Sequence, residues 1–189
     1  PVAFDFSACG HALCIIDSGA DHADLTEEYA AIPGEIKAVA AQFGQEVLSR
    51  VDEKEFYARL PELRKTCGDR AVLRAIHYYN ENRRVDAQVD ALERGDFEGF
   101  LEQVRQSGRS SYMLLQNVIV PGRAGQEMAL ALALCEKLLA GQGACRVHGG
   151  GFAGTVQAFV PHDRLEDFCY SIERVLGQGS CHVLDIRPQ

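Results

Sequence analysis

The stretch Cys145-Arg-Val-His-Gly-Gly-Gly-Phe-Ala-Gly-Thr-Val-Gln-Ala-Phe-Val160 contains two short apolar runs separated by four glycines. Residues 145–148 and 155–160 are rich in β-branched and apolar side chains, which predicts two strands. Apolar residues then recur at helical spacing: Leu165, Phe168, Cys169, Ile172, Val175 and Leu176. Two further apolar runs, residues 12–16 and 181–186, predict an early and a last strand. The chain is therefore predicted to be α+β, with a four-stranded, mainly antiparallel sheet covered by helices.

Helix boundary signals divide the rest of the chain. Asp163, three residues before Glu166, resembles a capping box, and Gly177 stands where a helix C-terminus favours positive φ. A long helix is predicted over residues 70–92, ended by Gly95. Asp96 is the predicted N-cap of the next helix, whose apolar face consists of Phe97, Phe100, Leu101 and Val104. Pro121 is predicted to start a further helix that runs to Gly141.

Composition limits the class of protein. The chain has 189 residues, 47% of them apolar and 24% charged, which predicts one globular domain over residues 1–189. The net charge of −8 and the pI near 5.2 argue against a nucleic-acid partner, because phosphate backbones need a basic surface. The absence of a leader-like or membrane-length apolar run predicts a soluble, cytoplasmic protein with no membrane partner. Because the chain starts at Pro1, we expect it to be part of a longer protein.

The seven cysteines are scattered along the chain and contain no C-x-x-C pair. An odd number without paired spacing argues against a disulfide framework or a structural zinc site. We therefore expect most of them to be reduced core residues, and we predict no metal site.

The glycine segment has two interpretations. Glycine permits positive φ and close approach of backbone N–H groups to a ligand, so Gly149, Gly150, Gly151, Phe152, Ala153 and Gly154 are the candidate active-site loop. A bulged hairpin explains the same spacing about equally well. The segment fits neither a dinucleotide-binding loop nor a Walker loop, because a strand follows it and no Gly-Lys-Ser/Thr is present.

The segment Arg146-Val-His-Gly-Gly-Gly-Phe-Ala-Gly154 resembles the third motif of the GHMP kinases, in its galactokinase form Arg-Met-Thr-Gly-(Ala/Gly)-Gly-Phe-Gly-Gly. It departs from that form at Val147, His148 and Ala153, where a Cβ restricts φ. Residues 74–96, starting Arg-Ala-Ile-His-Tyr-Tyr-Asn-Glu-Asn-Arg-Arg-Val, resemble without a gap another galactokinase stretch. His22 and Glu28-Tyr29 resemble the family's R-H…S-E-Y segment.

The match is poorer at two places. Leu115-Gln-Asn-Val-Ile-Val-Pro-Gly-Arg-Ala124 keeps the proline of the family's D-Y-x-V-S-x-P-E-L-D but not its acidic residues. Ala31-Ile-Pro-Gly34 replaces an arginine-rich stretch.

This resemblance implies a GHMP kinase C-terminal domain of ferredoxin-like fold, the C-terminal half of a galactokinase. The implied reaction transfers the ATP γ-phosphoryl group to the anomeric hydroxyl of galactose. The resemblance implies that the catalytic residues, and most contacts to ATP and Mg²⁺, belong to an N-terminal half absent from this chain. No catalytic residue is expected in these 189 residues, and the chain alone is predicted to be inactive. Tyr29 and, less directly, Glu28 are the implied sugar contacts, with galactose or a related sugar and the N-terminal half as partners.

Two alternatives remain open: a GHMP kinase for a different sugar, and a galactokinase-like sensor that binds sugar and ATP without efficient catalysis. From the residues alone, Tyr29 is as easily a core aromatic. His22 and His77 are interpreted as hydrogen-bonding core or boundary histidines, and His148 as a strand-end histidine bonded to the backbone. The segment 81–84 is interpreted as a solvated, charge-paired helix face.

Overall fold

The computed structural model describes residues 4–21 and 23–184, and its sheet has four strands. The strands are β1 (His11–Asp17), β2 (Ala144–His148), β3 (Thr155–Pro161) and β4 (Cys181–Leu184). They lie in the order β2-β3-β1-β4, and every neighbouring pair is antiparallel. The predicted α+β class and antiparallel sheet are confirmed. Of the predicted last strand, Asp185 and Ile186 lie outside the described residues.

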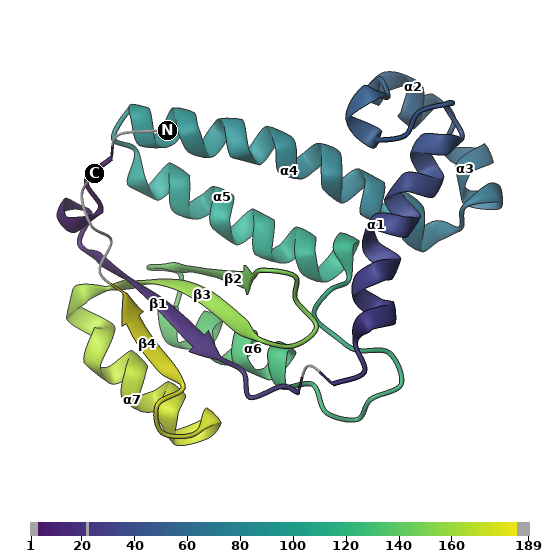
Figure 1. Cartoon of the computed structure of the whole chain (residues 1–189). Coiled ribbons are helices and arrows are strands. Elements are labelled where there is room, and N and C mark those ends of the chain that lie inside the picture. Colours follow the sequence, from purple (N-terminus) through teal and green to yellow (C-terminus); the bar gives the residue numbers. More distant parts are fainter. Residues whose placement is uncertain (1–3, 22, 185–189) are drawn as a thin grey trace.

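Helices cover both faces of this sheet. The helices are α1 (Thr26–Ala41), α2 (Glu53–Ala58), α3 (Leu60–Thr66), α4 (Asp69–Glu93), α5 (Phe97–Ser110), α6 (Glu127–Leu139) and α7 (Leu165–Leu176). Figure 1 shows α5 between α4 and the sheet on one side, with α6 and α7 on the opposite side. The short helices α2 and α3 pack with α1 at one end of α4 (Figure 1). Short helical turns fill three connections: Phe6–Ala8, Leu48–Arg50 and His162–Arg164.

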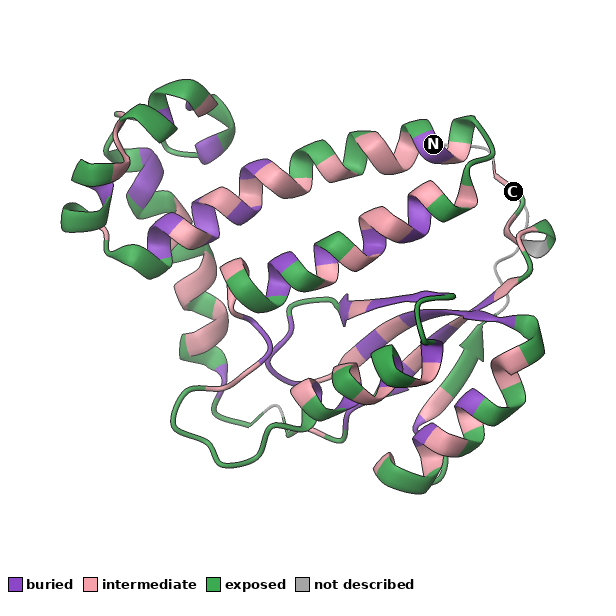
Figure 2. Cartoon of the chain, turned by 180° about the vertical axis from the view of Figure 1, so that it is seen from behind, coloured by how far each residue is buried: buried purple, intermediate pink, exposed green. Residues whose placement is uncertain are grey.

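The alternation of strand residues explains this layering. In β1, Ala12, Cys14 and Ile16 are buried; Cys14 and Ile16 belong to a core that includes Met128 of α6 and Ile172 of α7. Because successive strand side chains point to opposite faces, Leu13 packs instead with the cluster beneath α5. Figure 2 shows buried residues, in purple, along the sheet and on helix faces turned toward it.

Two predicted helix starts are wrong. Pro121 does not begin a helix; it opens a turn in which Gly122 has a φ of 77°, and α6 begins only at Glu127. Asp163 is not a capping residue, because it lies in the 3₁₀ turn His162–Arg164, and no side-chain hydrogen bond caps α7. The other predicted ends are confirmed: Asp96 accepts a hydrogen bond from the Gly99 amide at 2.8 Å, and Gly177 has a φ of 108°.

Candidate functional site

The glycine loop connects β2 to β3 at the edge of the sheet. Four of its residues have positive φ: Gly149 at 75°, Gly151 at 83°, Phe152 at 57° and Gly154 at 101°. This backbone region is unfavourable for residues with a Cβ, which explains three of the glycines. Phe152 adopts it nonetheless, and its side chain is buried together with Ala153 and Leu25.

Tyr29 of α1 holds the loop from one side. Its hydroxyl donates a hydrogen bond to the Gly151 carbonyl at 2.8 Å, and its ring meets the Phe152 ring edge-on with centroids 5.5 Å apart. A Cβ on Gly150 would come within 2.9 Å of the Tyr29 ring. Gly150 therefore has no side chain because Tyr29 occupies that space. The structure brings Tyr29 and the glycine loop together, as two separate stretches of sequence suggested.

Asn117 holds the loop from the other side, and it was missed in the sequence. Its carbonyl accepts a hydrogen bond from the Phe152 amide, and its Nδ2 donates to the Gly150 carbonyl at 3.1 Å. A Cβ on Gly151 would collide with Asn117. Asn117 follows a π-helical turn, Ser111–Leu115, at the end of α5. Its only sequence signal was its place in the stretch that matches the family poorly.

Three carbonyl groups of the loop accept hydrogen bonds from the protein, whereas several of its amide groups donate none within residues 4–21 and 23–184. Ser18, after β1, donates to the Gly154 carbonyl through its amide at 3.0 Å and its hydroxyl at 2.6 Å. With the bonds to Gly150 and Gly151, three loop carbonyls have donors. Among the described residues, no hydrogen-bond acceptor is found for the amides of Gly149, Gly150 and Gly151. Gly149 and Gly150 are exposed, so their amides can donate hydrogen bonds to an anion.

Ala153 fits the loop without strain. It is 3% exposed, packs in the Leu25 and Phe152 cluster, and is not among the positive-φ residues. Because its φ lies in the ordinary range, its Cβ is tolerated. The alanine that departs from the family pattern therefore replaces a glycine at a position where a glycine's conformational range is not needed.

Glu28 faces different surroundings from Tyr29. It lines a cavity of about 270 Å³ together with Arg70, Arg74 and Gln116. Both arginines are already paired with Glu35, Arg70 at 2.5 Å and the buried Arg74 at 2.9 Å. Of the two predicted sugar contacts, Glu28 therefore shares a cavity with these cations, whereas Tyr29 contacts the glycine loop.

A polar network lies beneath the strand that leads into the loop. Glu81 of α4 pairs with Arg146 of β2 at 3.3 Å and with Arg84 at 2.5 Å, and the Ser107 hydroxyl donates to Glu81. Burial opposes ionisation of Glu81, but the Ser107 hydrogen bond and the two arginines hold its pKa below the ordinary value. The interpretation of segment 81–84 as a solvated face is wrong for Glu81, whose side chain is 23% exposed.

The interpretations of the three histidines singled out in the sequence fare differently against the structure. His77 is buried and its Nδ1 lies 2.8 Å from the Ser110 hydroxyl, which confirms a hydrogen-bonded core histidine; burial lowers its pKa. His148 is exposed, and its Nδ1 lies 3.3 Å from the Gln157 side-chain oxygen rather than bonding to the backbone. His22 lies outside the described residues.

Comparison with known proteins shows what the chain is similar to. No family model matches the chain. A galactokinase from Mannheimia succiniciproducens is 31% identical over 156 residues, which are 82% of this chain and 39% of that protein. A galactokinase from Mycobacterium tuberculosis is 31% identical over 177 residues, 92% of this chain and 45% of that protein. The chain thus spans less than half the length of these relatives.

Solved structures show the same fold. The galactokinase of Lactococcus lactis, solved with galactose, matches 94% of this chain and 45% of its own, with a TM-score of 0.71 and 23% identity. The mevalonate kinase of L. major, solved with R-mevalonate, matches 95% of this chain and 43% of its own, with a TM-score of 0.58 and 12% identity.

The strand order and the helices on both faces therefore give the chain the same fold class as these two kinases, as predicted. Within that class, the chain is a homologue of galactokinases, and the part that it covers is consistent with their C-terminal half.

Proposed function

We propose that this chain is the C-terminal half of a galactokinase that transfers the ATP γ-phosphoryl group to the anomeric hydroxyl of galactose, giving galactose 1-phosphate. The domain covers residues 1–189, and a separate N-terminal half completes the active site. That half supplies the catalytic residues and most contacts to ATP and Mg²⁺. The reaction takes place in the cytoplasm, where ATP is available.

One observation carries the proposal: the glycine loop is fixed by Tyr29, Asn117 and Ser18, and the exposed amides of Gly149 and Gly150 have no acceptor among the described residues. Phosphoryl transfer depends on positioning and on stabilising negative charge. A rigid row of backbone donors suits that task. A simple bulged hairpin needs no such three-sided support, so the active-site interpretation is favoured over the hairpin alone.

Tyr29 is assigned to the sugar side of this loop. Its hydroxyl donates a hydrogen bond to the Gly151 carbonyl, and a phenolic hydroxyl is able to accept hydrogen bonds as well as donate one, which suits contact with a sugar hydroxyl. Because the same bond fixes Gly151, Tyr29 couples the sugar side to the loop. Glu28 has a secondary role from the neighbouring cavity.

The chain alone is expected to be inactive. A sugar hydroxyl needs a base that accepts its proton, and under this proposal that base belongs to the N-terminal half. Charge stabilisation without that base and without the nucleotide site gives no turnover.

Among the described residues, no helix is both long and apolar enough to cross a membrane.

The test compares the chain alone with the chain joined to its N-terminal half, using ATP and a panel of sugars and measuring sugar 1-phosphate. We expect galactose 1-phosphate only from the complete protein, and Tyr29→Phe to raise KM for galactose more than for ATP. Turnover by the chain alone would refute the division of roles. Turnover of another sugar in place of galactose would establish the different-sugar alternative, and binding of galactose and ATP without product would establish a sensor.

A further inference from the structure

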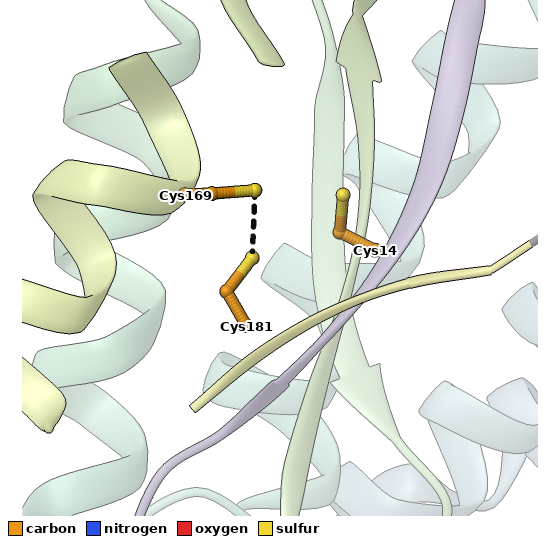
Figure 3. Close-up of side chains that lie close together, drawn as sticks. All are labelled: Cys14, Cys169 and Cys181. Carbon is orange, nitrogen blue, oxygen red and sulfur yellow. Dashed lines mark hydrogen bonds between the residues drawn. The ribbon is translucent and has the colours of Figure 1, made fainter. Parts of the chain in front are cut away.

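Three cysteines that the kinase proposal does not use meet between α7 and the sheet. Cys14 of β1, Cys169 of α7 and Cys181 of β4 have their sulfur atoms all within 4.8 Å of one another. Figure 3 shows Cys169 and Cys181 pointing toward each other, with Cys14 beside them. Their sequence spacing is irregular, so this cluster arises only from the fold.

Cys169 and Cys181 form the closest pair. Their sulfur atoms are 3.3 Å apart, and a disulfide bond is about 2.05 Å long, so side-chain rotation of little more than 1 Å would bring them to bonding distance. Both side chains are partly exposed, whereas Cys14 is fully buried. A small reagent can therefore reach Cys169 and Cys181 more easily than Cys14.

We propose that Cys169 and Cys181 are a thiol modification site, at which a low-molecular-weight disulfide such as glutathione disulfide oxidises them to an intramolecular disulfide. The thiolate of one cysteine attacks glutathione disulfide, forms a mixed disulfide and releases one glutathione. The second cysteine attacks the protein sulfur of that mixed disulfide and releases the second glutathione. Two protein thiols are oxidised, one glutathione disulfide is reduced, and the two thiol protons end on the two glutathione molecules.

The surroundings favour a disulfide over a metal ion. Burial raises the pKa of Cys169 to about 12, and contact with Cys14 together with burial raises the pKa of Cys181. The carboxylate of Glu173 raises the pKa of both thiols further, so the attacking thiolate is a minor species and the exchange is slow at neutral pH, although its equilibrium is unaffected. Three thiolates around a copper or zinc ion would carry net negative charge here, whereas a disulfide is neutral and suits an apolar site.

The disulfide would fasten an edge strand. Within residues 4–21 and 23–184, β4 pairs with β1 and with no other strand, and the bond would tie the first residue of β4 to α7. The preceding residue, Ser180, accepts a hydrogen bond from the Asp17 amide at 2.8 Å. Asp17 is followed by Ser18, which holds Gly154 of the glycine loop. Oxidation would therefore restrain the strand end from which the loop is anchored.

The test uses the whole chain equilibrated with mixtures of reduced and oxidised glutathione, quenched with acid, alkylated and digested with trypsin. The two cysteines fall in separate peptides, residues 165–174 and 175–189. We expect a linked pair of these peptides, with an equilibrium constant for linkage at least about tenfold larger in the folded chain than in concentrated urea. The oxidised chain should melt at least about 5 °C above the reduced chain, because the disulfide closes a loop and so restricts the unfolded chain.

Three variants complete the design. Cys67→Ser changes the partly exposed cysteine that follows the last residue of α3; it is the matched control and should leave the linkage unchanged. Cys14→Ala should also leave it, while Cys169→Ser should abolish it with circular dichroism unchanged. The proposal would be overturned if the two peptides linked as readily in urea as in the folded chain. It would also be overturned if Cys14 formed the disulfide, or if Cys14→Ala abolished the linkage.

Discussion

Gly149 and Gly151 provide a matched pair for testing how the loop is held. Both have positive φ, 75° and 83°, so alanine at either position has the same backbone cost of roughly 1–2 kcal/mol. Their surroundings differ. A Cβ on Gly149 meets nothing within 4 Å, whereas a Cβ on Gly151 collides with the carbonyl oxygen and side chain of Asn117. Overpacking adds roughly 1–3 kcal/mol, and it falls on Gly151 alone.

We therefore expect Gly149→Ala to reduce the free energy of unfolding by about 1–2 kcal/mol and Gly151→Ala by about 2–5 kcal/mol. At about 3 °C per kcal/mol for a chain of this size, these values correspond to melting shifts of about 3–6 °C and 6–15 °C. Urea titration followed by circular dichroism measures both free energies, with the m-value checked for two-state unfolding.

A second readout separates the loop from global stability. Gly151→Ala displaces the backbone away from Asn117, so in the complete protein it should lower kcat at a temperature where the variant is fully folded. Gly149→Ala should lower kcat less. Equal destabilisation by the two substitutions would refute the argument that Asn117 packs against Gly151.

Three further predictions follow from contacts in and around the site. Tyr29→Phe removes the hydrogen bond to the loop and should lower the free energy of unfolding by about 1 kcal/mol, measured by urea titration; no change would mean that the bond is not formed in solution. Glu81 and His77 both have lowered pKa values, so the unfolded chain binds more protons on acidification. The free energy of unfolding should therefore fall as the pH drops from about 7 to 4, less steeply in Glu81→Gln, and a pH-independent value would contradict this. Asp96→Ala should lower the free energy of unfolding by about 1 kcal/mol, because the Asp96 side chain caps α5. Asp163 was predicted to cap α7 but does not, so Asp163→Ala should leave the free energy of unfolding unchanged in the same titration.

The elements with strong periodicity were predictable from the sequence. The stripe of residues 165–176 and the terminator Gly177 depend on local spacing, and α7 ends where they indicate. The strands beside the glycines were predictable for the same reason, because alternation and β-branched side chains act over a few residues. The four strands also fixed the α+β class.

Helix starts were harder to predict, because residue types that begin helices also form turns. Pro121 fits the first turn of a helix and also the first corner of a β-turn, and Gly122 after it favours the turn. Asp163 has cap-like spacing to Glu166, but Pro161 directs the chain into a 3₁₀ turn first. Local sequence does not decide between these states; packing does.

The candidate site was predictable only in part. Gly149 to Gly154 and Tyr29 were found through resemblance, although neither the spacing nor the helix position of Tyr29 identifies a site. Asn117 and Ser18 were missed because they act largely through backbone groups and long-range contacts, 33 and 136 residues from their loop partners. Such contacts leave no periodic signal. The cysteine cluster was hidden for the same reason.

In the glycine loop, three carbonyl groups are hydrogen-bonded within the protein, while the exposed amide groups of Gly149 and Gly150 remain available to a ligand. Gly150, Gly151 and Gly154 have their oxygens bound by the protein, while the amides of Gly149 to Gly151 point to no acceptor among the described residues. A cation brought against this surface would meet N–H dipoles with their positive ends toward it and would be repelled. This surface of the loop therefore favours the oxygen atoms of a ligand over a cation.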